Sequence, residues 1–506
     1  MKVLKKYLYI LTVIVLGSGC EGFLDKNPTD QLSSGLFWKS KSDFDNALAA
    51  VYGTLQNSIY SFGVPNWDVI TDNGYGQHNY EGSNGIVQGN IFPSSGGYIS
   101  SVYTSSYQAI ARINIFLENL EAYQGEDMDN DLKMTYEGET KFIRAFYYFQ
   151  LYTAYGSVPI VTEPLNFENQ HQEKRPATEV FDQVISDLDE AIELLPEEAF
   201  YNSNGHAVKA SAEALKVRVL LFVAYDENGN AQADIMQSAK EHVLSVMESG
   251  YELDEEYTHV FQDATQEGNQ EIIFSIKFLA PDNSTPMDQW YGDWLVVSPL
   301  QNMVDEYEYI DGLPFGESPL TDADAPFSNR DPRLGHTIFV DEVDWGGGNT
   351  HRPSNDRPTG YGLKKFLTPE LTPYGYSTRS QQDWVLLRYA DILLMYAEIE
   401  NELEGPTASV YEAVDAVRNR SEMPGLPQGL SQEEMRQRIR HERRVELAFE
   451  GLRYYDLKRW KIAGEVLNNV DDGIIPYNFE DRFYHWPIPQ SEIDKSDGIL
   501  VQNPDY

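Results

Sequence analysis

The sequence predicts a mainly α protein in which antiparallel helices pair and stack, as in tetratricopeptide repeats, around an irregular insert. Three observations support this fold class. Apolar residues recur at helical spacing in about nine segments, most of them neighbours in the chain. Residues 251–382 lose that spacing and are rich in Gly, Pro, Asp and Asn. The apolar fraction of 41%, with 13% aromatic residues, is typical of a globular protein.

Six helices are expected before the insert. The clearest carries Phe142, Phe146 and Phe149 on one stripe, and Gly156 follows it as a C-terminal glycine would. The same criterion of apolar residues three or four positions apart selects the other five. The expected helices cover residues 43–55, 107–120, 136–155, 178–195, 211–225 and 231–249.

The insert is too long to be a structureless loop inside a compact domain, so we expect it to fold locally. Within it, residues 271–278 alternate as in a strand, with Ile272, Phe274 and Ile276 on one face. Helical spacing returns in residues 384–403, 408–420 and 431–449. The basic run 436–444 in the last helix is interleaved with glutamates, which predicts ion pairs rather than an anion site.

The N-terminus has the pattern of a secretory signal. Three lysines precede an apolar run over residues 7–16, which is too short to span a bilayer, and small residues 17–19 follow. Cys20, the only cysteine, comes next and resembles the acylated cysteine of a bacterial lipobox, although Leu16 stands one position earlier than usual. We therefore predict a signal peptide over residues 1–19 and lipidation at Cys20.

Composition excludes several classes of function. A formal net charge of −42 disfavours binding to nucleic acid, which needs Lys and Arg against the phosphates. One cysteine excludes an internal disulfide or a Cys-rich zinc site. Two loops, at 127–138 and 226–237, resemble EF-hand loops but lack the glycine and the glutamate that calcium requires. With no motif for a phosphate, dinucleotide or metal cofactor, we expect neither a cofactor nor a metal, and no enzyme.

The later part of the chain carries motifs that identify a family. The runs 384–398 and 439–460, Trp486-Pro-Ile-Pro489 and the terminal Gln502-Asn-Pro-Asp-Tyr506 resemble the SusD/RagB family of Bacteroidetes outer-membrane lipoproteins. Phe23-Leu-Asp25, Phe37-Trp-Lys39, 139–146 and 155–159 resemble the same family in the same order. The resemblance covers residues 20–506, and it divides them into an N-terminal helical region, 20–250, and a C-terminal region, 251–506, with a variable insert at 251–382.

The resemblance implies a function in glycan uptake. Members are surface-exposed, non-enzymatic lipoproteins that bind an oligosaccharide or polysaccharide and sit as a lid on a SusC-like TonB-dependent transporter of the outer membrane. Their eight helices form four tetratricopeptide-like pairs, and loops on one face carry the ligand. Two alternatives remain, a surface glycoside hydrolase and a helical-repeat scaffold that binds protein.

Sugar binding needs flat aromatic rings beside hydroxyl-binding polar groups, which allows the tryptophans to be sorted. Trp38, Trp384, Trp460 and Trp486 lie in family motifs or helical stripes and are expected in the core. The other four lie in loops with no apolar period, where they either bind ligand or pack locally. The candidate glycan-binding residues are Trp67, Asp72, Asn73, Tyr75, Tyr80, Trp290, Tyr291, Trp294, Trp345 and Arg352.

Overall fold

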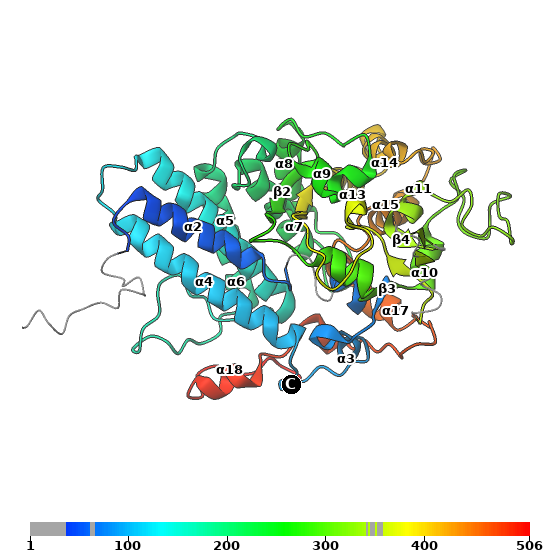
Figure 1. The fold of residues 1–506 in the computed structure, drawn as a ribbon. Coiled ribbons are helices and arrows are strands. Elements are labelled where there is room, and N and C mark those ends of the chain that lie inside the picture. Colours follow the sequence, from blue (N-terminus) through cyan, green and yellow to red (C-terminus); the bar gives the residue numbers. More distant parts are fainter. Residues whose placement is uncertain (1–36, 61–65, 341–342, 345–349, 352–357) are drawn as a thin grey trace, which may run out of the picture.

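The computed structural model describes residues 37–60, 66–340, 343–344, 350–351 and 358–506, and its fold is mainly α-helical, as predicted (Figure 1). Every helix expected before the insert is present, although the second and third begin at residues 98 and 130 and not at the predicted 107 and 136. They are α2 (Lys41–Leu55), α4 (Tyr98–Ala122), α5 (Asn130–Tyr155), α6 (Ala177–Leu194), α7 (Lys209–Val223) and α8 (Ala233–Met247). Neighbouring helices pack in pairs, α5 on α6 and α7 on α8.

After the insert come α13 (Tyr389–Glu404), α14 (Ala408–Arg420) and α15 (Gln432–Glu446). The prediction that the first of these begins at Trp384 is wrong. Residues Trp384–Arg388 form strand β8, which pairs antiparallel with β2 (Ile272–Ile276). The apolar run of β8 fits either a strand or a helix by pattern, and pairing decides because β2 needs a partner for its backbone groups.

The insert folds into short elements, as predicted, although two of its strands pair with strands outside it. The expected strand is β2, but all five of its residues are buried, so its two faces do not alternate between core and solvent. Strand β1 (Gly74–Gly76) pairs with β3 (Val297–Pro299), β4 (Ile338–Phe339) with β7 (Gly362–Leu363), and β5 (Val343–Asp344) with β6 (Thr350–His351). Short helices occur both inside and outside the insert. They are α3 (Ser83–Val87), α9 (Asp263–Gln266), α10 (Gln301–Glu306), α11 (Pro332–Thr337), α16 (Arg453–Arg459), α17 (Ala463–Leu467) and α18 (Gln490–Lys495).

Helix α5 illustrates how local signals and packing agree. Asp129 caps its start by accepting a hydrogen bond from the Leu132 amide at 2.9 Å. Gly156 follows its last residue with φ of 69°, a value that favours glycine. From the middle of the helix, the buried Arg144 donates to Asp187 on α6 at 2.6 Å and to Asn114 on α4 at 2.9 Å. One buried side chain therefore links three helices.

A single large hydrophobic core includes residues from Phe44 to Leu500, so it is continuous across the boundary at residue 250. A smaller cluster lies between α13, α14 and α15. Trp384, Trp460 and Trp486 are buried in the large core, as predicted. Trp38 is half-buried, and its ring lies 5.0 Å from that of Phe44.

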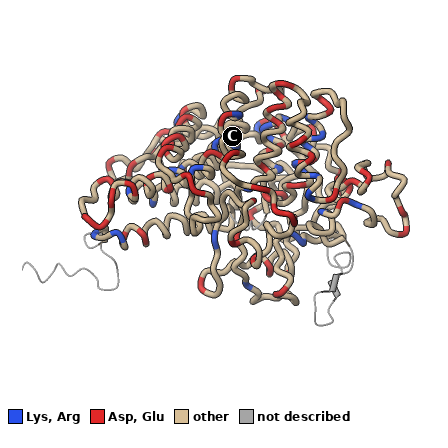
Figure 2. The backbone as a smooth tube through the Cα atoms, turned by 90° about the horizontal axis from the view of Figure 1, so that it is seen from above, with Lys and Arg blue, Asp and Glu red and all other residues tan. Residues whose placement is uncertain are grey.

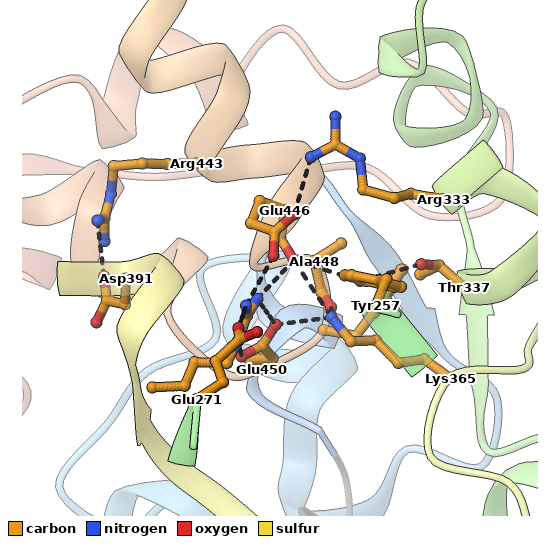
Figure 3. A network of polar contacts seen from close by, with 12 residues as sticks. Tyr257, Glu271, Arg333, Thr337, Lys365, Asp391, Arg443, Glu446, Ala448 and Glu450 are labelled. Carbon is orange, nitrogen blue, oxygen red and sulfur yellow. Dashed lines mark hydrogen bonds and ion pairs between the residues drawn. The ribbon is translucent and has the colours of Figure 1, made fainter. Parts of the chain in front are cut away.

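A buried network of ionised side chains joins the insert to the C-terminal helices (Figure 3). Its centre is Glu446, at the end of α15, which is fully buried. One carboxylate oxygen accepts hydrogen bonds from Arg388 at 2.7 Å and from Arg420, and the other accepts from Arg333 at 2.8 Å. Within the basic run of α15, Arg443 pairs with Asp391 at 2.8 Å. This confirms the prediction that the run forms ion pairs.

The loops that resemble calcium sites connect helices. Asp129 is the helix cap described above, and Asp226 accepts hydrogen bonds from the amides of Asn228 at 2.8 Å and Asn230 at 2.9 Å. Among the described residues, no cluster of three His, Cys, Asp or Glu side chains is arranged to hold a metal ion. Nor does any helix in the same ranges combine the length and the apolar character needed to cross a bilayer. Asp and Glu are spread over the molecule and outnumber Lys and Arg (Figure 2).

Acid is expected to destabilise the fold partly through Glu398 on α13, which is buried beside Arg459 of α16. Burial opposes its ionisation, but Arg459 outweighs burial and lowers the pKa of Glu398 to about 2. Because the unfolded pKa is near 4.3, the stabilisation is complete above that value and disappears as pH falls to about 2, a change of about 3 kcal/mol.

Urea titrations at neutral pH and at about pH 3 test this expectation. Glu398→Gln should cost stability at neutral pH and lose less stability than the wild type on acidification, because its side chain does not titrate. An equal loss in both proteins on acidification would contradict the assignment.

Candidate functional site

Four aromatic side chains from three separate segments form a continuous row, which we call the aromatic row. The rings of Tyr80 and Trp290 lie 5.8 Å apart with an interplanar angle of 18°, and those of Trp290 and Trp294 lie 6.1 Å apart at 13°. Tyr376 extends the row, 5.9 Å from Trp294 at 45°. Tyr80, Trp290 and Trp294 are half-buried, whereas Tyr376 is 75% exposed. The sequence analysis selected the first three of these residues.

Local backbone structure aligns the two tryptophans. Residues Gln289–Asp293 form a π-helical turn, and the Trp294 amide donates to the Gln289 carbonyl at 2.9 Å. Side chains four positions apart therefore lie on the same side of the turn. The pairing of β1 with β3 brings in the third ring, since it places Gln77 against Val296 with a backbone hydrogen bond of 3.1 Å. Tyr80 follows three residues later.

Polar groups border the row. The Arg379 guanidinium donates to the side-chain oxygen of Gln289 at 2.6 Å and to the Thr378 carbonyl at 2.7 Å. The Thr378 hydroxyl accepts a hydrogen bond from the Gly375 amide at 2.8 Å, which fixes the loop that carries Tyr376. Flat rings present π-faces to C–H groups, and amide and guanidinium groups bind hydroxyls. This combination suits the apolar face and the hydroxyl groups of a sugar chain.

Gly292, inside the π-helical turn, allows the Tyr374 ring to approach closely. A Cβ at this position would lie 2.5 Å from Cδ2 and 3.2 Å from Cβ of Tyr374. Rotation of the ring relieves the contact with Cδ2 but not the one with Cβ, so the Tyr374 backbone, two residues before Tyr376, would also have to shift.

We therefore expect Gly292→Ala to displace Tyr376 from the row and to weaken glycan binding by about fivefold to tenfold. The measurement is retention of the protein in gels that contain polysaccharide. Gly375→Ala is the matched control, because a Cβ there meets no atom within 4 Å. Equal retention of the two variants would contradict the expected role of Gly292.

Two other predicted aromatic residues lie in packed surroundings. Trp67 is half-buried, donates its indole N–H to the Ile59 carbonyl at 2.8 Å and stacks on Trp486 at 6.0 Å with an angle of 5°. Tyr291 is fully buried, and its ring lies 6.0 Å from that of Phe366. Burial raises the pKa of the Tyr291 hydroxyl well above its usual value. Both side chains therefore have partners inside the protein.

The predicted polar residues near β1 also have partners inside the protein. Asp72 is buried and accepts two hydrogen bonds from Arg453, at 2.9 and 2.8 Å. Burial opposes ionisation of Asp72, but Arg444 and Arg453 hold the pKa of this carboxyl well below its usual range. Asn73 accepts from Arg444 at 2.9 Å. Tyr75 is half-buried, and its hydroxyl lies 3.5 Å from the side-chain amide of Asn84.

Trp345, Arg352 and Cys20 lie outside the described residues. The sequence analysis missed Tyr374, Tyr376 and Arg379, which all belong to one loop. The signal was available, because Tyr374-Gly-Tyr376 stands in a Gly/Pro-rich stretch that meets the criterion applied to the loop tryptophans. Extending that criterion from tryptophan to tyrosine would have selected both aromatic residues.

Comparison with known proteins gives a consistent result. Residues 257–506 match the model of the SusD family, and residues 22–221 match a model described as "Starch-binding associating with outer membrane". The chain is 27% identical to SusD-like protein P25 of Formosa agariphila, with 99% of this chain and 98% of the relative aligned. It is 26% identical to SusD-like protein P38 of the same organism, with 92% of each chain aligned.

Solved structures agree over nearly the whole chain. A SusD-like protein from Bacteroides fragilis superposes with a TM-score of 0.79 at 25% identity, covering 95% of this chain and all of that one. A laminarin-binding SusD-like protein superposes with a TM-score of 0.68 at 26% identity, covering 92% of this chain and all of that one. The two family models match successive parts of the chain in order, and with these structures they establish that the chain belongs to the SusD/RagB family.

Proposed function

We propose that the protein binds an oligosaccharide or polysaccharide on the aromatic row, without cleaving it, and delivers it to a SusC-like TonB-dependent transporter in the outer membrane. The observation that carries this proposal is the row itself, in which Tyr80, Trp290, Trp294 and Tyr376 follow one another at spacings of 5.8, 6.1 and 5.9 Å. Successive rings suit successive units of one chain, because each ring binds the C–H face of a sugar without regard to its neighbours.

The relatives support a carbohydrate ligand. One solved relative is named a laminarin-binding SusD-like protein, and another, from Bacteroides fragilis, is called a SusD-like carbohydrate-binding protein at 25% identity. The family description adds association with the outer membrane. Delivery also favours reversible binding. A half-buried row releases its ligand more readily than a closed cavity, because less surface must return to water on release.

Native gels cast with a panel of neutral and acidic polysaccharides test the proposed function, with reducing sugar measured on the same samples. Retardation by at least one polysaccharide without reducing-sugar release is the expected result. Release of reducing sugar would show a hydrolase and refute the claim that the glycan is not cleaved. Neither retardation nor release across the panel would refute glycan binding and favour a scaffold that binds protein.

The anchor is proposed at Cys20, where two acyl chains would hold the mature protein on the outer membrane. Cells fed labelled palmitate should label the wild type and not Cys20→Ser, and the variant should leave the membrane fraction. Labelling of the variant would place the lipid elsewhere.

The transporter is tested separately, by asking whether a TonB-dependent barrel co-purifies with the protein from native membranes in mild detergent. Its absence would contradict delivery while leaving binding intact.

A further inference from the structure

A pocket separate from the aromatic row is lined in part by Tyr374, whose ring packs on Gly292 of the π-helical turn. Its volume of about 380 Å³ falls within the range of pockets that hold small ligands. We call it the Lys364 pocket. It is lined by residues of the 3₁₀ turn Tyr257–Phe261, by His336 and Phe339, and by the segment from Lys364 to Tyr374.

The walls of the Lys364 pocket are aromatic and rigid. Tyr257, Phe261, Phe339, Phe366 and Tyr374 all line it. The ring of Phe366 packs 5.4 Å from Phe261, and it also lies against Trp384 and Tyr291. Its backbone has φ of 74°, a conformation that a phenylalanine keeps only where its surroundings hold it. Four of these rings are buried and make the wall rigid, whereas Tyr374 is half-buried and can offer a face to the C–H groups of a sugar ring.

The charges around this pocket have one sign. Lys364, Lys365 and His336 line it, and no Asp or Glu does. Each of four other hollows among the described residues includes at least one acidic side chain. In a protein with a formal charge of −42, a pocket with two lysines and no carboxylate among its lining residues is a local exception.

The two lysines have different tasks. The ammonium of Lys365 points into the ion network (Figure 3), where it donates to Glu450 at 2.7 Å and to the Ala448 carbonyl at 3.0 Å. That of Lys364 donates to the Gly335 carbonyl at 2.7 Å, next to His336. An ammonium has three donors, so two remain for a ligand. Within the part of the chain that the structure describes, Lys364 forms no ion pair.

The pKa values of Lys364 and His336, at the edge of the Lys364 pocket, agree with an ammonium that has no ion pair. Burial lowers the pKa of Lys364 and also that of His336, which the charge of Lys364 lowers further. A cation whose pKa falls on burial lacks sufficient counter-charge, and an anion placed beside it would restore the balance.

We propose that the Lys364 pocket binds an anionic sugar unit, with its ring against Tyr374 and its carboxylate or sulfate group at the Lys364 ammonium. This inference rests on the proposed glycan-binding function and deepens it. The Lys364 pocket and the aromatic row share the 372–378 loop, so one glycan with an acidic unit or branch can engage both.

Titrations followed by NMR with glucuronate, glucose 6-sulfate and glucose test the proposal on the full-length mature protein. At least one anionic sugar should bind about tenfold more tightly than glucose. Tighter binding of glucuronate identifies the acidic group of the ligand as a carboxylate, and tighter binding of glucose 6-sulfate identifies it as a sulfate. Glucose binding as tightly as both anions, or no binding of any of the three up to roughly 20 mM, would overturn the proposal.

Variants locate the binding. Lys364→Gln should reduce the preference for the anion to about that of glucose, whereas Lys364→Arg should keep it because the charge is retained. Lys495→Gln removes an exposed lysine of α18 and should change nothing. A preference that survives in Lys364→Gln would refute the assigned site. The proposed function is read independently, from retardation of neutral polysaccharides by the wild type, so either conclusion can fail while the other stands.

Discussion

Replacing Trp290 by alanine should weaken glycan binding by about tenfold to hundredfold, which is about 1.5–3 kcal/mol. Trp290 lies inside the aromatic row, between Tyr80 at 5.8 Å and Trp294 at 6.1 Å, with both neighbouring rings within 18° of its own plane. Its removal takes away one platform and interrupts the row for a chain that spans it. Terminal members have one neighbour within the row, so Tyr376→Ala should cost less.

The measurement is the dissociation constant from gels over a series of polysaccharide concentrations. Phe167→Ala is the matched control, because Phe167 is 94% exposed and lies in a different loop, so its removal deletes an aromatic ring without touching the row. Urea unfolding of both variants shows whether the fold persists. If Trp290→Ala bound as tightly as Phe167→Ala while both remained folded, the aromatic row would not be the glycan site.

The helical scaffold was predictable because its signal is local. Where apolar residues recur at helical spacing, as with Phe142, Phe146 and Phe149 of α5, the spacing alone predicts both the helix and the face that it buries. The apolar run Trp384–Arg388 does not distinguish a helix from a strand, since a segment this short fits the spacing of both. Its conformation depends on β2, which is more than a hundred residues earlier in the chain.

The site was predictable in part for the same physical reason. Trp290 and Trp294 align through a turn of their own backbone, so proximity in sequence was enough. Whether Trp67 faces a ligand or the core depends on Trp486, and whether Asp72 is available depends on Arg453. Those partners lie about 400 residues away, beyond the reach of any pattern in a single sequence.

Loss of the Glu446 carboxylate is expected to give the largest change in stability, about 3–5 kcal/mol for Glu446→Ala. This carboxylate accepts hydrogen bonds from Arg333, Arg388 and Arg420, and all three guanidinium groups are buried (Figure 3). Burial opposes its ionisation, but the three arginines hold the pKa of Glu446 well below its usual range. Alanine would leave three buried cations short of one negative charge.

Glu433 on the same helix provides the matched control. It is largely exposed and pairs with Arg436 near the start of α15, so Glu433→Ala should cost about 0.5 kcal/mol or less. Urea midpoints of the two variants, measured at neutral pH, give the comparison. Glu446→Gln should fall between them, because the amide keeps one acceptor oxygen and loses the charge. Equal midpoints for Glu446→Ala and Glu433→Ala would show that the remaining acids Glu271, Glu442 and Glu450 suffice to neutralise the arginines. The network would then hold the insert on α15 through the ion pairs that Glu442 forms with Arg333 and that Glu271 and Glu450 form with Arg388, without depending on Glu446.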